Sequence, residues 1–174
     1  MRCRWEILLP GDDGARLRAA GEEALREIER VEARLSAFEP ASAVSGLNAR
    51  AADGWVRVDG EIFHLLSLCR ELSDATEGAF DVTVGPLLEC WGFRGERDDV
   101  PSEEEIAAAR AATGMALVEM DSGACAVRFG RPGVALDLGA IGKGYALDRA
   151  GEILRDLGIA FRSEEHTSEL QSQN

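Results

Sequence analysis

Histidine and cysteine are too few and too scattered in this chain to predict a zinc cluster. The sequence contains only two histidines and four cysteines: His64, His166, Cys3, Cys69, Cys90 and Cys125. No two cysteines have the Cys-x-x-Cys spacing that is typical of zinc sites. Cys69 falls on the apolar face of a predicted helix and Cys125 in a predicted strand, so both are predicted to be buried thiols. A disulfide between two of the four cysteines is the alternative to free thiols.

Long apolar runs are also missing, and a bilayer-spanning helix needs about 20 consecutive apolar residues. Arg2, Arg4 and Glu6 interrupt the first residues, which argues against a secretory signal at this start. We therefore expect no membrane segment in the chain and a cytoplasmic location for it as it stands. An exported or membrane-anchored location stays open if the true N-terminus lies upstream of Met1.

Basic residues are scarce relative to acidic ones. The chain has 19 Lys and Arg against 32 Asp and Glu, for a formal net charge of −13. That balance repels a nucleic-acid backbone or an anionic membrane surface, so neither is an expected partner. An anionic ligand would need local cations and backbone amides, or a divalent metal that bridges it to the acidic protein.

The 174 residues, 45% of them hydrophobic, are enough for one domain with a core. Apolar periodicity predicts an α+β fold, in which helices pack on a mixed sheet. The predicted helices cover residues 15–37, 62–75, 103–112 (with a capping box at Ser102 and Glu105) and 145–157. The predicted strands are residues 3–9, 55–58, a hairpin of 115–120 with 125–129, and 134–138; residues 38–48 are predicted to form a loop.

The most informative stretch is residues 134–148. It predicts a buried strand ending at Asp137, then a glycine-rich turn that carries Lys143, then an amphipathic helix. Backbone amides, a helix N-terminus and a cation would meet at this point, an arrangement that favours a phosphate. The stretch therefore indicates a phosphate-bearing ligand, with a nucleotide as the first candidate.

The glycines of this stretch match neither common phosphate-binding motif. Gly139, Gly142 and Gly144 lack the spacing of Gly-x-Gly-x-x-Gly, and Gly144 stands where a Walker A loop has Ser or Thr. The alternative is a tight structural turn that needs glycine for positive φ. Lys143 would then be a solvated turn residue.

Residues 162–174 differ from the rest of the chain. They are polar and lack periodicity, and they match the in-frame translation of a common sequencing-library adapter. We expect them to be a non-native tail, with residues 1–161 as the native part; a natural disordered tail is the alternative.

Three stretches together resemble the ApbE family, the FAD:protein FMN transferases. They are Leu35–Asn48, Thr76–Leu87 followed by Trp91-Gly92-Phe93, and Asp137–Asp148. The resemblance runs from Met1 to about Ala160, or roughly the N-terminal half of a typical member. It implies an ApbE-like α+β fold that is truncated before its C-terminal half.

The resemblance also implies an activity. Family members use FAD and a divalent metal, usually Mg²⁺, with Mn²⁺ also open here. They transfer FMN from FAD to a Thr or Ser hydroxyl of an acceptor protein and release AMP. A metal suits this chemistry because it neutralises charge on a pyrophosphate that is being cleaved.

The resemblance also implies site residues, at the positions of this sequence that match the family's motifs. Phe38 falls where the family has an aromatic residue, usually Tyr, that stacks on the flavin, and Met1 falls where a family Met touches FAD. The remaining FAD-contacting positions match Ala79, Phe80, Asp81, Asp137 and Lys143. Ala140 matches a residue whose backbone carbonyl binds the metal. Judged singly, Phe80, Trp91 and Phe93 are predicted to be core aromatics, and Asp81 is predicted to cap a turn or helix.

The chain departs from the family pattern at several positions. Arg2 and Cys3 replace the Gly-Thr of the first motif, and Ala43 replaces a glutamate. The catalytic residues are unknown and are expected in the C-terminal half, together with the family's Asp and Thr metal ligands. We expect this chain to bind metal poorly and to have little transferase activity.

Two other functions stay open. The chain could be a module that binds FAD or another nucleotide without transferring it. It could also be a non-catalytic α+β interaction domain whose glycine-rich turn is only structural.

Overall fold

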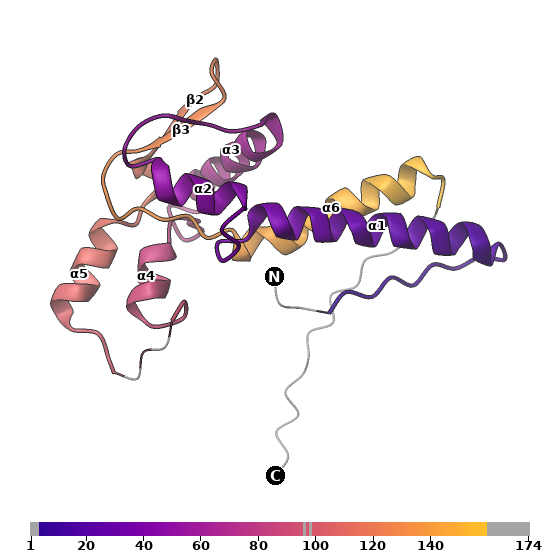
Figure 1. The fold of residues 1–174 in the computed structure, drawn as a ribbon, viewed down its shortest axis with the longest axis horizontal. Coiled ribbons are helices and arrows are strands. Elements are labelled where there is room, and N and C mark those ends of the chain that lie inside the picture. Colours follow the sequence, from indigo (N-terminus) through magenta and orange to yellow (C-terminus); the bar gives the residue numbers. More distant parts are fainter. Residues whose placement is uncertain (1–3, 96, 98, 160–174) are drawn as a thin grey trace, which may run out of the picture. The chain divides into compact units, whose positions relative to one another are not determined.

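Apolar residues at helical spacing form the first long helix of the protein. A computed structural model describes residues 4–95, 97 and 99–159 (Figure 1). Helix α1 spans Gly14–Leu35, as predicted. Intervals of three and four residues place its apolar side chains on one face. Its buried residues are Ala20, Ala24, Ile28, Val31 and Leu35.

The described residues combine helices with a small antiparallel sheet, which confirms the α+β prediction. The elements after α1 are α2 (Ala43–Arg50), β1 (Val56–Arg57), α3 (Gly60–Ala75), α4 (Gly85–Cys90), α5 (Glu103–Ala111), the 3₁₀ helix η1 (Met115–Leu117), β2 (Val118–Asp121), β3 (Ala126–Phe129) and α6 (Gly139–Asp156). Helix α5 begins with the predicted capping box.

The predicted hairpin is confirmed as β2 and β3, and the sheet has the order β1-β3-β2. Val56 of β1 pairs with Val127, and Val118 of β2 pairs with Phe129. The prediction of a buried strand position for Cys125 is wrong. Cys125 lies half-exposed in the hairpin turn with φ of +46°, because the tight turn requires a left-handed residue there.

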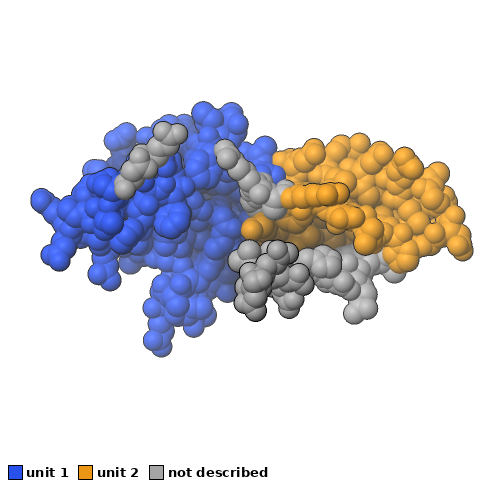
Figure 2. Space-filling model, turned by 90° about the horizontal axis from the view of Figure 1, so that it is seen from below, with its two compact units in different colours: residues 1, 32–142 blue, residues 2–31, 143–174 orange. Residues whose placement is uncertain are grey.

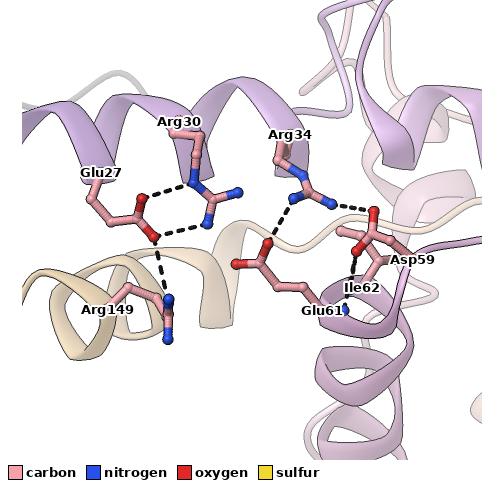
Figure 3. A network of polar contacts seen from close by, with 7 residues as sticks. All are labelled: Glu27, Arg30, Arg34, Asp59, Glu61, Ile62 and Arg149. Atoms are coloured by element: carbon pink, nitrogen blue, oxygen red, sulfur yellow. Dashed lines mark hydrogen bonds and ion pairs between the residues drawn. The ribbon is translucent and has the colours of Figure 1, made fainter. Parts of the chain in front are cut away.

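Helix α3 lies beside the sheet, where Arg70 donates to the carbonyl of Val118. Asp59 caps the helix by accepting from the amides of Glu61 and Ile62, both at 3.1 Å. Arg34, in the last turn of α1, also donates to Asp59 and Glu61 (Figure 3). The end of α1 is thereby fixed to the start of α3.

Two short helices lie where no helix was predicted. Helix α2 begins within the predicted loop 38–48 and continues to Arg50. Its first turn is capped by Ser42, whose hydroxyl accepts from the amide of Ser45 at 2.9 Å. Its sequence, Ala-Val-Ser-Gly-Leu-Asn-Ala-Arg, has low helix propensity. Helix α4 follows a bridge at Val84 and has Pro86 in its first turn. Tertiary contacts therefore outweigh propensity at both sites.

Two predicted strands are absent from the described residues. Residues 4–9 alternate between exposed and half-buried side chains, as a strand would, but no strand pairs with them. Residues 134–138 are extended, with Val134, Leu136 and Leu138 buried. They form only one parallel bridge, between Ala135 and Val84, because α4 begins at Gly85 and ends the pairing.

The chain divides into two compact units (Figure 2). The first contains residues 32–142, and the second contains residues 2–31 and 143–174. Within the second unit, Glu27 of α1 accepts from Arg30 at 2.8 Å and from Arg149 of α6 at 3.4 Å (Figure 3). No described helix has both the length and the apolar character needed to cross a bilayer. The expected non-native tail, residues 162–174, lies outside the described residues.

Candidate functional site

A hollow of about 90 Å³ lies between the turn after α1 and the start of α6, entirely within the first unit. Leu35, Ser36 and Phe38 line it at the end of α1 and in the following turn, and Asp137 and Gly139 line it at the start of α6. Pockets that hold whole cofactors usually measure about 300–1,000 Å³. The hollow therefore has room for part of a dinucleotide only.

Phe38 stands at this hollow as an exposed aromatic ring. Its exposed fraction is 68%, so most of the ring is accessible to a ligand. The Ser36 hydroxyl oxygen accepts from the amides of Phe38 and Glu39, both at 3.1 Å, and fixes the turn. The ring is thus held on a defined backbone with surface free for stacking.

Asp137 is held by hydrogen bonds to both carboxylate oxygens. Oδ1 accepts from the amide of Gly139 at 2.8 Å, and Oδ2 accepts from the guanidinium of Arg94 at 2.5 Å. An added Cβ at Gly139 would lie 2.8 Å from Oδ1. Glycine at this position therefore allows the carboxylate to approach the first turn of α6.

Arg94 is the residue at this site that sequence reasoning missed. Besides Asp137, it donates to the carbonyl of Leu136 at 3.2 Å, and its Cζ lies 5.7 Å from the centroid of the Phe38 ring. Its Nε is buried without a partner among the described residues. Arg94 directly follows Trp91-Gly92-Phe93, but the sequence does not show that it meets a carboxylate 43 positions away.

Residues 79–81 directly precede Val82, whose carbonyl accepts from the Asp137 amide at 2.7 Å. The Asp81 carboxylate accepts from the amide and hydroxyl of Thr83 at 2.7 and 2.6 Å, which makes it a turn residue. Ala79 is exposed and Phe80 is half-buried. None of the three lines the hollow.

The aromatic pair of the second motif is not in the core. Trp91 is 48% exposed and Phe93 is 76% exposed, so the prediction that they are core residues is wrong. Gly92, with φ of +76°, ends α4 in a left-handed conformation. Trp91 and Phe93 therefore flank this turn at the surface.

The predicted glycine-rich turn is itself helical. α6 begins at Gly139, six residues before the predicted start. The alternative that these glycines supply positive φ is therefore also wrong. Gly139 donates to Asp137, and Ile141 and Gly142 donate to the carbonyl of Leu138 at 3.2 and 2.7 Å. Three of the first four amides of α6 thus have protein partners, so a phosphate here would have to compete for them.

Comparison with known proteins decides the family. The model of the ApbE family matches residues 1–161. The chain belongs to the ApbE family. An FAD:protein FMN transferase from Klebsiella pneumoniae (strain 342) is 34% identical over 139 residues, or 79% of this chain and 43% of the relative. One from Escherichia coli (strain K12) is 29% identical over 161 residues, or 90% of this chain and 46% of the relative.

Solved structures of ApbE proteins share this fold. The ApbE protein of Thermotoga maritima is 37% identical, with a TM-score of 0.80 over 87% of this chain and 48% of that structure. The flavin transferase ApbE of Vibrio cholerae is 29% identical, with a TM-score of 0.76 over 90% of this chain and 48% of that structure. The chain thus spans slightly less than half the length of these relatives.

The ApbE-type residues of this chain do not form a metal site by themselves. No group of three His, Cys, Asp or Glu residues among the described residues could hold an ion. Ala140 is exposed in the first turn of α6, where helix geometry directs its carbonyl to the amide four residues on. Both oxygens of Asp137 are already hydrogen-bonded. The described residues therefore do not fit a bound divalent ion.

Lys143 is not among the residues that line the hollow. Lys143 is exposed on α6 and belongs to the second unit. Met1 lies outside the described residues. Of the seven positions expected to contact FAD, the hollow brings together Phe38 and Asp137.

Proposed function

We propose that this chain provides the flavin-binding portion of an FAD:protein FMN transferase. The family match over residues 1–161 and the names of the relatives support this function. The observation that carries the proposal is the hollow itself. It joins the exposed ring of Phe38 to the fixed carboxylate of Asp137, although the two residues are far apart in sequence.

Each of these two residues has a distinct role in binding. Phe38 stacks on the flavin ring, since offset aromatic stacking is favourable and the ring is accessible. Asp137 accepts a hydrogen bond from a ligand hydroxyl or ring N–H, because a carboxylate oxygen that already accepts one bond has a second lone pair. Because the hollow is small, it holds only part of FAD, and the remainder lies beyond it.

The transfer would move the FMN half of FAD, through its phosphorus atom, onto the hydroxyl of an acceptor Thr or Ser. The hydroxyl oxygen forms a bond to the FMN phosphorus, the bond from that phosphorus to the AMP oxygen breaks, and the hydroxyl proton is released. Mg²⁺ or Mn²⁺, when bound, would neutralise phosphate charge. We expect the metal ligands and the catalytic residues in the part of the relatives that this chain does not span.

The chain alone should therefore bind FAD and transfer little FMN. This behaviour corresponds to a binding module without transferase activity. It is favoured for the chain by its coverage of 43–48% of the relatives.

The proposal is tested by titrating FAD against the 174-residue chain and following flavin fluorescence. Phe38→Ala and Asp137→Asn should weaken binding. The matched control is Phe93→Ala, because Phe93 is also an exposed phenylalanine but does not line the hollow. Equal affinity for all four proteins would contradict the assigned site.

Two further measurements separate the alternatives. Incubation with FAD, Mg²⁺ and a threonine-bearing acceptor peptide should release little AMP; robust turnover would show that the chain carries the catalytic residues itself. FAD should also raise the melting temperature, since a ligand that prefers the native state stabilises it. No rise at millimolar FAD would favour a non-catalytic interaction domain.

A further inference from the structure

Arg94 connects the two residues that define the hollow. Its guanidinium donates to Oδ2 of Asp137 at 2.5 Å and to the carbonyl of Leu136 at 3.2 Å. Its Cζ also lies 5.7 Å from the Phe38 ring centroid. Arginine suits this position because its planar guanidinium can bond an acceptor and cover an aromatic face at the same time.

The contact with Asp137 is the stronger of the two. The side chains of Arg94 and Asp137 are only 13% and 16% exposed, so solvent screens their attraction little. By contrast, 5.7 Å is close to the limit of about 6 Å for a cation–π contact. Arg94 should therefore act mainly through the carboxylate.

The chain contains a second arginine with the same types of partner. Arg128 lies over the Trp55 ring at 4.8 Å and pairs with Glu119. Both charged side chains of that pair are 41% exposed, on the sheet rather than at the hollow. Arg128 is thus a control that matches Arg94 in chemistry but not in location.

We propose that Arg94 is a positioning residue for ligand binding at this hollow: it fixes the Asp137 carboxylate in the orientation that accepts a hydrogen bond from the flavin ligand. The inference rests on the proposed function for its ligand, but the Arg94–Asp137 coupling can be measured without one. Arg94 also neutralises Asp137, which lowers the repulsion that an anionic dinucleotide meets in this acidic chain.

The binding test uses Arg94→Gln, Asp137→Asn and their double variant in the 174-residue chain, titrated with FAD. Loss of a charge-assisted hydrogen bond predicts that Arg94→Gln weakens binding about tenfold. In the Asp137→Asn background the same change should have an effect of less than about twofold. Arg94→Lys keeps the charge but not the planar guanidinium and should recover only part of the affinity. Arg128→Gln should bind like wild type.

A tenfold loss that persists in the Asp137→Asn background would overturn the positioning role, because Arg94 would then contact the ligand directly. Wild-type affinity in Arg94→Gln would overturn it as well.

Urea unfolding of the same variants without FAD decides the coupling independently. The shifts in midpoint for Arg94→Gln and Asp137→Asn should not add in the double variant, whereas additive shifts would overturn the proposal. If wild type binds no FAD but the shifts are non-additive, the proposed function fails and the fixation of Asp137 by Arg94 stands.

Discussion

Asn48 and Leu136 are 88 positions apart and pair through two hydrogen bonds. The Asn48 Oδ1 accepts from the Leu136 amide at 2.7 Å, and its Nδ2 donates to the Leu136 carbonyl at 3.0 Å. Leu136 is fully buried, so its amide has no access to water. The side chain of α2 therefore supplies the bonds that a neighbouring strand would otherwise make.

Asn48→Ala should lower the free energy of unfolding by about 1–3 kcal/mol, because it leaves a buried amide without an acceptor. The measurement is urea unfolding followed by circular dichroism. Asp53→Ala, at an exposed position, serves as control and should change stability by less than about 0.5 kcal/mol. Equal stability of both variants would show that the Leu136 amide finds another partner.

Gly85 and Gly144 should respond oppositely to alanine. A Cβ at Gly85 would lie 2.5 Å from the carbonyl oxygen of Ala135, whereas one at Gly144 would have no atom within 4 Å. Gly85→Ala should therefore cost about 1–3 kcal/mol through overpacking. Gly144→Ala, inside α6, should gain up to about 1 kcal/mol from helix propensity. Thermal unfolding of both variants tests the pair, and a stabilised Gly85→Ala would contradict the close approach.

The thiol of Cys69 should be unreactive in the native protein. Burial raises its pKa to about 12, and only the thiolate is nucleophilic. Iodoacetamide at pH 8 should label Cys90 and Cys125, which are half-buried, and should label Cys69 only after denaturation. Peptide mass spectrometry reads the result, and rapid native labelling of Cys69 would contradict its burial.

The same shift has a consequence at alkaline pH. The unfolded thiol ionises near its ordinary pKa of 9.0, whereas the folded pKa is about 12. This thiol therefore leaves the free energy of unfolding unchanged below pH 9, and it lowers that free energy as the pH rises toward 12.

Glu105 should stabilise the start of α5 only while it is ionised. Hydrogen bonds from Arg97, followed by those from Ser102, lower its pKa to about 2 from the ordinary 4.5. Because the folded pKa is depressed, the stabilisation is present above pH 4.5 and is lost as the pH falls toward 2. Glu105→Gln keeps a side chain that suits the capping box. Its melting temperature should lie below that of wild type at pH 7, and the difference should close between pH 4.5 and 2.

Periodicity predicted α1 and α3 because each helix buries a regular apolar stripe. α1 and α3 each bury a stripe at intervals of three and four residues, and the capping box fixed the start of α5. α2 and α4 escaped prediction because eight and six residues are too few for a clear period. Their stability comes from contacts such as that between Asn48 and Leu136.

Family motifs indicated two residues of the candidate site, whereas its tertiary contacts could not be predicted. Phe38 and Asp137 follow from the resemblance, and the hollow brings both together. Arg94 could not be predicted, because its role depends on the packing of residue 94 against residue 137. The predicted start of α6 was six residues late because its glycines suggest a turn. In the structure they are helical, and the Asp137 carboxylate accepts from the amide of Gly139, the first residue of the helix.

The polar contacts around residues 136 and 137 join segments that are 43 and 88 positions apart. Closing such large loops costs chain entropy before any contact compensates, so these contacts should form late in folding. Capture of a flavin at this hollow would accordingly mark completion of the native core. In a refolding experiment, a rise in flavin signal would trail the recovery of helical structure.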